Sequence, residues 1–350
     1  MREERTSGRS TEIVYKVFRT TPDDVKEWLG YIRFKGLDGD GTIEITNRRA
    51  TLQPWHLDLA GSSKVGDAAQ AGAHGEGLKL ALLVLMRGPQ NHAVRCRSGA
   101  FNWRFNFTTR GRLVARLRRM TPPSIVRAED QAQRLSERTL LPFAVRPAHD
   151  VQFVIGEPHK GRCEWGSPIR RRAVTRASFD DWTKAALFLR DAKDGTVVMT
   201  AHGDLLTDPS LRGKIYLKGL LLGESTPDRP ASLTNLPLQF GYNFAFGVTN
   251  REREFLSTAS EEAAAILKIW SGALTAKPEV VKELSDMLNA ESQCADVSGA
   301  RHRLSAEMAS TLKNYLFGDE FKSKWYYTDE ERSQVRKFLD LCWRSPPPIY

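Results

Sequence analysis

The sequence predicts an α+β protein in which a mixed sheet carries helices on one face and a helical region follows. Three observations favour this class. Segments with the alternation and β-branched composition of strands recur over residues 11–120. A glycine-rich turn interrupts these segments and continues into the apolar stretch 80–86. Beyond residue 259, apolar side chains recur at helical spacing instead.

The expected elements can be placed in order along the chain. The segments with strand character are 11–19, 31–35, 42–46, 92–97, 102–107, 113–117, 151–156, 196–200 and 214–222. The turn Asp38-Gly39-Asp40-Gly41 connects the second and third of them. The segments with helix character are 54–59, 80–87, 128–138, 179–189, 260–274, 278–288, 306–316 and 329–342. Gly88-Pro89 ends the second helix, and Ser260 is the expected N-cap of the fifth.

The chain of 350 residues is long enough for two domains. We expect residues 1–10 to be polar and disordered and residues 11–120 to form the first domain. A linker around Thr121-Pro122-Pro123 would lead into a second α+β domain, 124–258. Residues 259–350 would form the C-terminal helical region.

Composition favours a soluble protein of the cytoplasm or nucleus. There is no apolar run of about 18 residues for a membrane span, and the N-terminus lacks the apolar core of a secretory signal. The four cysteines are scattered without a C-x-x-C pair, and the histidines lack H-x-x-x-H spacing, so no metal site is expected.

The charge balance points to anionic partners. The formal net charge is +10, and a basic surface attracts nucleotides, nucleic acids and other polyanions. The arginines gather in two clusters, which contain Arg110, Arg112, Arg116, Arg118 and Arg119, then Arg170, Arg171, Arg172 and Arg176. The alternative interpretation is scattered solvated charge without a nucleic-acid partner.

The glycine-rich turn is the clearest candidate site. It reads Gly72-Ala73-His74-Gly75-Glu76-Gly77-Leu78-Lys79. Its glycines permit close backbone approach, and the first-turn amides of the following helix favour an anion. Lys79 would oppose the helix dipole unless it reaches toward a bound phosphate. The alternative is a tight loop-to-helix junction with Lys79 in solvent.

This G-x-x-G-x-G-L-K spacing resembles the third nucleotide-binding box of the GHKL ATPase superfamily. That group includes histidine kinases, gyrase B, MutL, the MORC proteins and the ninety-kilodalton heat-shock chaperone. The preceding stretches 39–47 and 61–64 follow in the family's order, over roughly residues 12 to 120. In the second domain, 214–219 with 241–243 and 249–253 resembles GHKL-related proteins of unknown function, mainly fungal.

The resemblance implies an α/β sandwich that binds ATP with magnesium. The residues that it implies for the phosphates are Gly72, Gly75, Gly77, Leu78 and Lys79, with Ser62, Ser63 and Lys64 lining the lid and Asn47 near the base. His74 could hydrogen-bond a phosphate or cap the loop. Glu76 could act as a base, although a glutamate there also suits the helix dipole.

Two departures from the family pattern argue against strong ATPase activity. No E-x-x-x-N helix precedes the first strand, and the second box reads Asn47-Arg48-Arg49-Ala50-Thr51, without its aspartate and glycines. In the family, the glutamate of the E-x-x-x-N motif activates the attacking water. Its loss should slow hydrolysis on the order of 10²–10⁴-fold.

Three hypotheses follow. The first is a GHKL-like ATP-binding protein with weak or lost ATPase activity. The second is an RNA-using biosynthetic enzyme on a decayed ATPase fold, such as an aminoacyl-tRNA-dependent (cyclo)dipeptide synthase, which the basic clusters motivate. The third is a non-catalytic scaffold.

Overall fold

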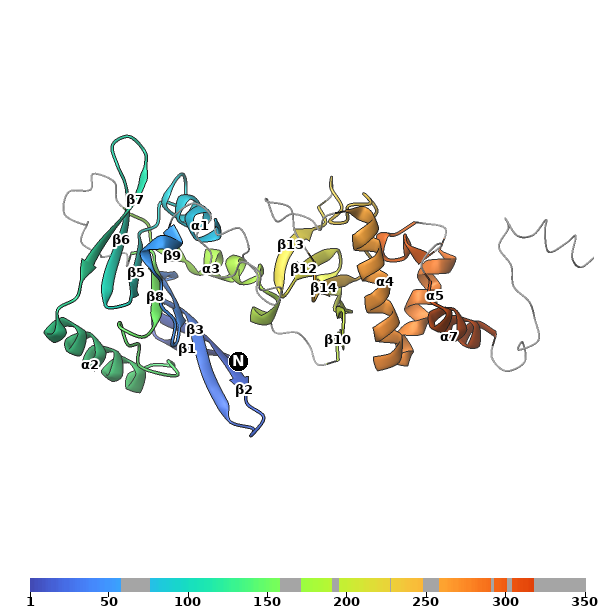
Figure 1. Cartoon of the computed structure of the whole chain (residues 1–350), viewed down its shortest axis with the longest axis horizontal. Helices are drawn as coiled ribbons and strands as arrows, with labels where there is room; N and C mark the ends of the chain where they lie inside the picture. The colour runs from blue at the N-terminus through green and yellow to red at the C-terminus, as the bar shows by residue number, and fades with distance from the viewer. Residues whose placement is uncertain are drawn as a thin grey trace, which may run out of the picture.

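The computed structural model describes residues 1–57, 76–157, 171–190, 195–226, 228–247, 258–290, 293–300 and 304–317. Within them the chain forms two sheets with helices packed on each (Figure 1). The coarse prediction of an α+β protein is therefore confirmed.

The first sheet is built from the N-terminal half of the chain. Its strands are β1 (Arg2–Ser7), β2 (Ser10–Thr20), β3 (Lys26–Leu37), β4 (Asp40–Asn47), β5 (Val94–Ser98), β6 (Phe101–Phe107), β7 (Leu113–Arg119), β8 (Val151–Ile155) and β9 (Val174–Thr175). The spatial order is β1-β2-β3-β4-β8-β5-β6-β7, and β9 also pairs with β4. All of these strand pairs are antiparallel.

One face of the first sheet is apolar because alternate residues of each strand point to the same side. Helices α1 (Gly77–Met86) and α3 (Arg176–Thr183) cover this face. Phe34 stacks on Phe179 with ring centroids 5.2 Å apart, and Trp103 is buried in the same apolar cluster as Leu82 of α1. We call this side the covered face.

The opposite side, which we call the open face, is only partly covered. Helix α2 (Pro122–Arg138) and the segment after it pack on Val14 and Tyr31 of β2 and β3. Beside them lies a buried guanidinium, Arg33, with Nε 3.0 Å from Glu12 Oε1 and Nη1 3.2 Å from Glu44 Oε2. The other half of this face, over β5–β7, is not covered by α2.

The second sheet follows in the chain and carries the C-terminal helices. Its strands are β10 (Val197–Thr200), β11 (Gly203–Leu206), β12 (Lys214–Leu217), β13 (Leu220–Glu224) and β14 (Gly241–Phe244), in the order β10-β11-β14-β12-β13. It is mixed, because β12 and β14 run parallel. The helices are α4 (Ala259–Ala276), α5 (Val281–Asn289) and α7 (Ala306–Phe317). Short 3-10 turns are η1 (Pro54–Leu57), η2 (Leu187–Leu189), η3 (Pro209–Leu211), η4 (Pro278–Val280) and η5 (Ala295–Val297).

The second unit is held by the buried apolar face of α4 and a small polar network. Trp270 Nε1 donates to Tyr242 Oη at 2.9 Å, and Tyr242 Oη donates to Asp296 Oδ1. Backbone bonds link the two units, since Leu187 N donates to Gly219 O at 2.7 Å and Leu221 N to Ala185 O at 2.8 Å.

Several expectations need correction. Residues 2–7 are not disordered but form β1, which pairs with β2. The expected boundary at 120–124 is wrong for the sheet, because β8 inserts between β4 and β5 and completes the first core. The first sheet is antiparallel rather than mixed, and α2 lies on the face opposite to α1.

The expected helix 179–189 is also interrupted. Helix α3 ends at Thr183, and Ala186 adopts an extended conformation that bridges to Leu220 of the second sheet. The backbone bonds gained there replace those of a continuous helix. The expected helix 329–342 lies outside the described residues.

Candidate functional site

The glycine-rich turn is only partly within the described residues. Six of the implied nucleotide-site residues lie outside them: Ser62, Ser63, Lys64, Gly72, His74 and Gly75. Glu76 occupies the N-cap position of α1, and Gly77 is the first helical residue. Leu78 packs against the core of the covered face, which orients the helix on the sheet.

The described part of the turn includes the N-terminus of α1. Glu76 makes no side-chain cap hydrogen bond to α1, and the first turn contains no acidic residue. First-turn amides of a helix have no intrahelical acceptor. Lys79 lies in that turn.

Asn47 is the last residue of β4 and is exposed. Along this strand it alternates in phase with Ile43 and Ile45, so it belongs to the covered face. Asn47 and α1 therefore lie on the same side of the sheet.

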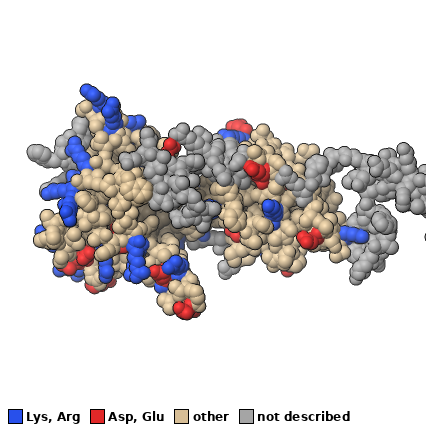
Figure 2. All heavy atoms as spheres, in the orientation of Figure 1, with Lys and Arg blue, Asp and Glu red and all other residues tan. Residues whose placement is uncertain are grey.

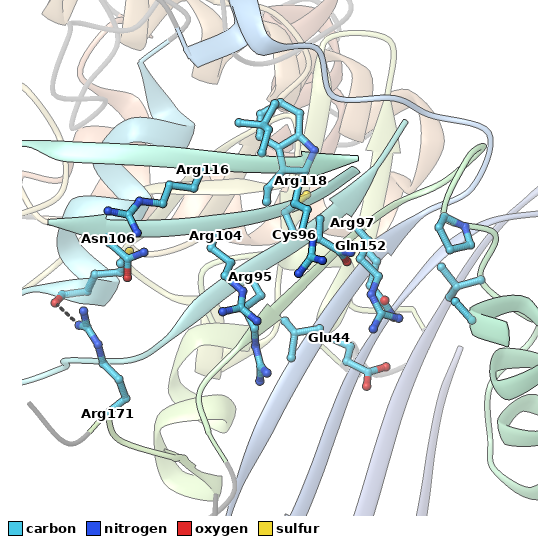
Figure 3. A pocket seen from close by; sticks show the side chains of 18 of the residues that line it. Glu44, Arg95, Cys96, Arg97, Arg104, Asn106, Arg116, Arg118, Gln152 and Arg171 are labelled. Carbon is cyan, nitrogen blue, oxygen red and sulfur yellow. Dashed lines mark hydrogen bonds between the residues drawn. The ribbon is translucent and has the colours of Figure 1, made fainter. Parts of the chain in front are cut away.

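The open face over β5–β7 contains two rows of basic and polar side chains set by strand register. In the first row, Arg95 lies directly opposite Arg104, which lies directly opposite Arg116. The second row, two residues along, contains Arg97, Asn102 and Arg118, with Gln152 of β8 paired to Arg97. We call these side chains the arginine rows. Figure 3 shows the five arginines and Gln152 projecting from one side of the strands.

The rows form the floor of a cavity of about 1670 Å³ whose wall is α2. The arginines that line it are Arg87, Arg95, Arg97, Arg104, Arg116, Arg118, Arg134, Arg138 and Arg171. Glu44 is the one acidic residue among the described residues of this lining, and it pairs with the buried Arg33. Figure 2 shows basic side chains gathered over the first unit, at the left of the view.

No ion pair of Arg95, Arg97, Arg116 or Arg118 occurs within the ranges that the structure describes. Two cations at the rim are instead fixed by neutral groups. Arg171 Nη1 donates to Asn91 Oδ1 at 2.8 Å and to Met86 O at 3.1 Å, at the C-terminal end of α1.

Arg87 is the other fixed rim cation. It stacks 4.5 Å above the Phe107 ring centroid and donates from Nη2 to Gly111 O at 2.6 Å. These contacts of Arg87 and Arg171 with described residues are thus to uncharged groups.

This arrangement has an electrostatic cost. Like charges directly opposite on neighbouring strands are destabilising, by an amount comparable to the roughly 0.2–1 kcal/mol of a favourable pair. Folding alone does not require three arginines in one cross-strand row, whereas binding of an anion would offset their repulsion.

Groups suited to acid–base or nucleophilic chemistry are not assembled here. Burial raises the pKa of the Cys96 thiol to about 12, so it is not a thiolate at neutral pH. Burial lowers the pKa of His92, whose ring bonds Arg172 O and Gln90. In the part of the chain that is described, no group of three or more His, Cys, Asp and Glu side chains could hold a metal ion.

Part of this surface was predictable from the sequence, because Arg116 and Arg118 lie in one of the two basic clusters. Arg95, Arg97 and Arg104 were not predicted. The missing signal was the two-residue turn Gly99-Ala100, both at positive φ, which pairs Ser98 with Phe101 and thereby Arg95 with Arg104. Arg170 lies outside the described residues.

Comparison of the sequence with protein-family models finds no match, and a search of curated proteins finds no similar sequence. The resemblance of the glycine box to the GHKL superfamily therefore stays a prediction from the sequence. None of the helices described is long and apolar enough to span a bilayer.

Proposed function

We propose that this chain is a GHKL-like nucleotide-binding protein that holds ATP at the start of α1, with weak or lost ATPase activity. The observation that carries the proposal is the placement of Asn47 and α1 on the same face of one sheet, with η1 between them in sequence. That is the order of elements that the glycine box leads one to expect.

The physical support is the N-terminus of α1. Its first-turn amides have no side-chain cap from Glu76, and the helix dipole favours negative charge at this end. A triphosphate would satisfy the amides and offset the unfavourable position of Lys79. Asn47 would offer an amide to the base, in place of the family's carboxylate. Magnesium would accompany the phosphates as their counterion.

Calorimetry with Mg-ATP tests this proposal. We expect binding that Lys79→Ala weakens about tenfold, which corresponds to about 1.4 kcal/mol. Lys282→Ala, an exposed lysine on α5, is the matched control and should bind ATP like the wild type. Asn47→Ala should reduce the preference for ATP over GTP more than it reduces phosphate affinity. Absence of heat, or equal heat from wild type and Lys79→Ala, would refute the proposal.

A second candidate, an RNA-dependent biosynthetic enzyme, is favoured by one observation. Such an enzyme needs a surface that binds an RNA backbone, and the arginine rows have the required charge. If neither ATP nor RNA shifts the melting temperature, the scaffold hypothesis is the one that survives.

A further inference from the structure

We propose that the half of the open face formed by β5–β7 binds the sugar–phosphate backbone of a single-stranded nucleic acid. The strand would lie in the groove between the arginine rows and α2. This site is on the opposite side of the sheet from the proposed ATP site, so the two proposals stand or fall separately.

The strand register sets the arginines in a regular pattern. Arg95, Arg104 and Arg116 are direct cross-strand neighbours, and the row of Arg97 and Arg118 lies two residues further along the strands. Neighbouring strands are about 4.8 Å apart and two residues span about 6.8 Å, so the guanidinium groups form a regular grid. A grid of planar cations suits a ligand with repeated phosphates, which guanidinium groups bind in bidentate fashion.

Acidic side chains are distributed unevenly over the two halves of the open face. On the β2–β4 half of the same face, Arg33 has two glutamates within 3.2 Å. The cavity over β5–β7 is lined by nine arginines, and Glu44 is the one acid among the described residues that line it. Among the described residues, the fold therefore neutralises the cation that it buries, whereas Arg95, Arg97, Arg116 and Arg118 have no acidic partner there.

The shape and polarity of the cavity also favour a single-stranded nucleic acid. A volume of about 1670 Å³ exceeds the roughly 300–1,000 Å³ typical of a pocket for one drug-sized molecule. The wall formed by α2 favours a single strand over a wide duplex. Asn102, Asn106 and Gln152 line the cavity between the arginines and can bond sugars and base edges. Binding would depend mainly on phosphates and be tolerant of sequence.

The salt dependence can be stated in advance. For single strands the slope of log K against log salt is about −0.7 per neutralised phosphate. Engagement of the five arginines of the rows therefore predicts a slope of about −3.5. Removal of three of them should reduce its magnitude by about 2.

The test is fluorescence anisotropy with a labelled oligouridine and a duplex RNA of equal length, over about 50 to 200 mM salt. The test variant is Arg97→Gln/Arg116→Gln/Arg118→Gln. The control variant is Arg212→Gln/Lys268→Gln/Lys282→Gln, which removes the same charge from exposed positions of the second unit. We expect the test variant to bind oligouridine at least tenfold more weakly, with the shallower slope, and the control to change affinity less than twofold.

Three outcomes would overturn the proposal. They are equal losses in both variants, duplex binding as tight as single-strand binding, and no binding by the wild type. Misfolding cannot produce the expected result unnoticed, because removal of like charges should leave the melting temperature of the test variant unchanged or higher. The test variant should also retain the calorimetric response to Mg-ATP, which separates this site from the proposed nucleotide site.

Discussion

The two halves of the open face use arginine in opposite ways. Under α2, Arg33 is 1% exposed and lies between Glu12 and Glu44, while Arg5 reaches the second oxygen of Glu12 at 3.0 Å. Over β5–β7, the arginine rows lie in an open groove, and the one acid among its described lining residues, Glu44, pairs with Arg33. A buried cation needs partners to be tolerated at all, whereas an exposed one does not. The charge of Arg33 is used in ion pairs within the fold, whereas the charges of the arginine rows are available to a ligand.

The largest expected effect comes from removing the buried Arg33, which is paired with two glutamates. Arg33→Ala leaves two carboxylates in a buried site without their cation, so it should lower the free energy of unfolding by about 3–5 kcal/mol. Urea denaturation followed by circular dichroism measures this loss.

The control for this prediction removes all three charges together. Glu12→Gln/Arg33→Met/Glu44→Gln should recover much of the lost stability, because no isolated buried charge remains. A loss under 1 kcal/mol for Arg33→Ala would mean that Arg33 and its two glutamates are not buried as described.

A smaller, pH-dependent effect is expected where a buried carboxylate lacks an arginine. Glu262 of α4 is 1% exposed and accepts hydrogen bonds from Ser232 Oγ and from Leu233 N, the latter at 3.1 Å. Burial raises its pKa above the ordinary 4.5. A raised carboxyl pKa means that the folded state binds the proton more tightly, so this contribution to stability is present below pH 4.5 and is lost as pH rises through the folded pKa.

Melting curves across that window, for wild type and Glu262→Gln, test the sign. The variant should lose less stability than the wild type between acid and neutral pH, because its side chain does not ionise. A steeper decline in the variant would contradict the assignment.

The next effect comes from placing an acidic side chain in the arginine rows. Arg116→Glu places a carboxylate directly opposite Arg104, turning a repulsive cross-strand pair into an attractive one. We expect a gain of about 0.2–1 kcal/mol in the free energy of unfolding, together with weaker binding of oligouridine. Arg116→Gln should fall between wild type and Arg116→Glu. Destabilisation by the glutamate would show that the rows are held by contacts other than those described.

Salt should produce the smallest effect. At about 1 M the Debye length is about 3 Å, which screens the exposed rows but reaches the buried Arg33 pair much less. The stability difference between wild type and Arg116→Glu should therefore shrink on adding sodium chloride. The difference between wild type and Arg33→Ala should persist.

The sequence indicated most strands but not how they assemble. Alternation located β4 through its residues Ile43, Glu44 and Ile45, because side-chain period is a local property. It could not show that β8 inserts between β4 and β5, since these pairings join residues 104–112 and 55–61 positions apart. The first ten residues were misjudged because their charged strand gains its stability from pairing with β2.

The candidate site was predictable to a similar degree. The glycine box could be recognised as a motif, because its chemistry lies in consecutive residues. The arginine rows could not be, because each row takes one residue from each of three strands. Reading Gly99-Ala100 as a two-residue hairpin turn would have recovered the Arg95–Arg104 pair.

Strand β7 ends the first sheet, and no described strand pairs with its outer side. An unpaired edge is a template on which a second molecule can add, and charges along it are a common safeguard against aggregation. Arg116, Arg118 and Arg119 supply that safeguard, because edge-to-edge stacking of two copies would bring their guanidinium groups together. Multivalent anions screen this repulsion between guanidinium groups. Polyphosphate or co-purified nucleic acid should therefore promote aggregation, which a buffer free of multivalent anions prevents.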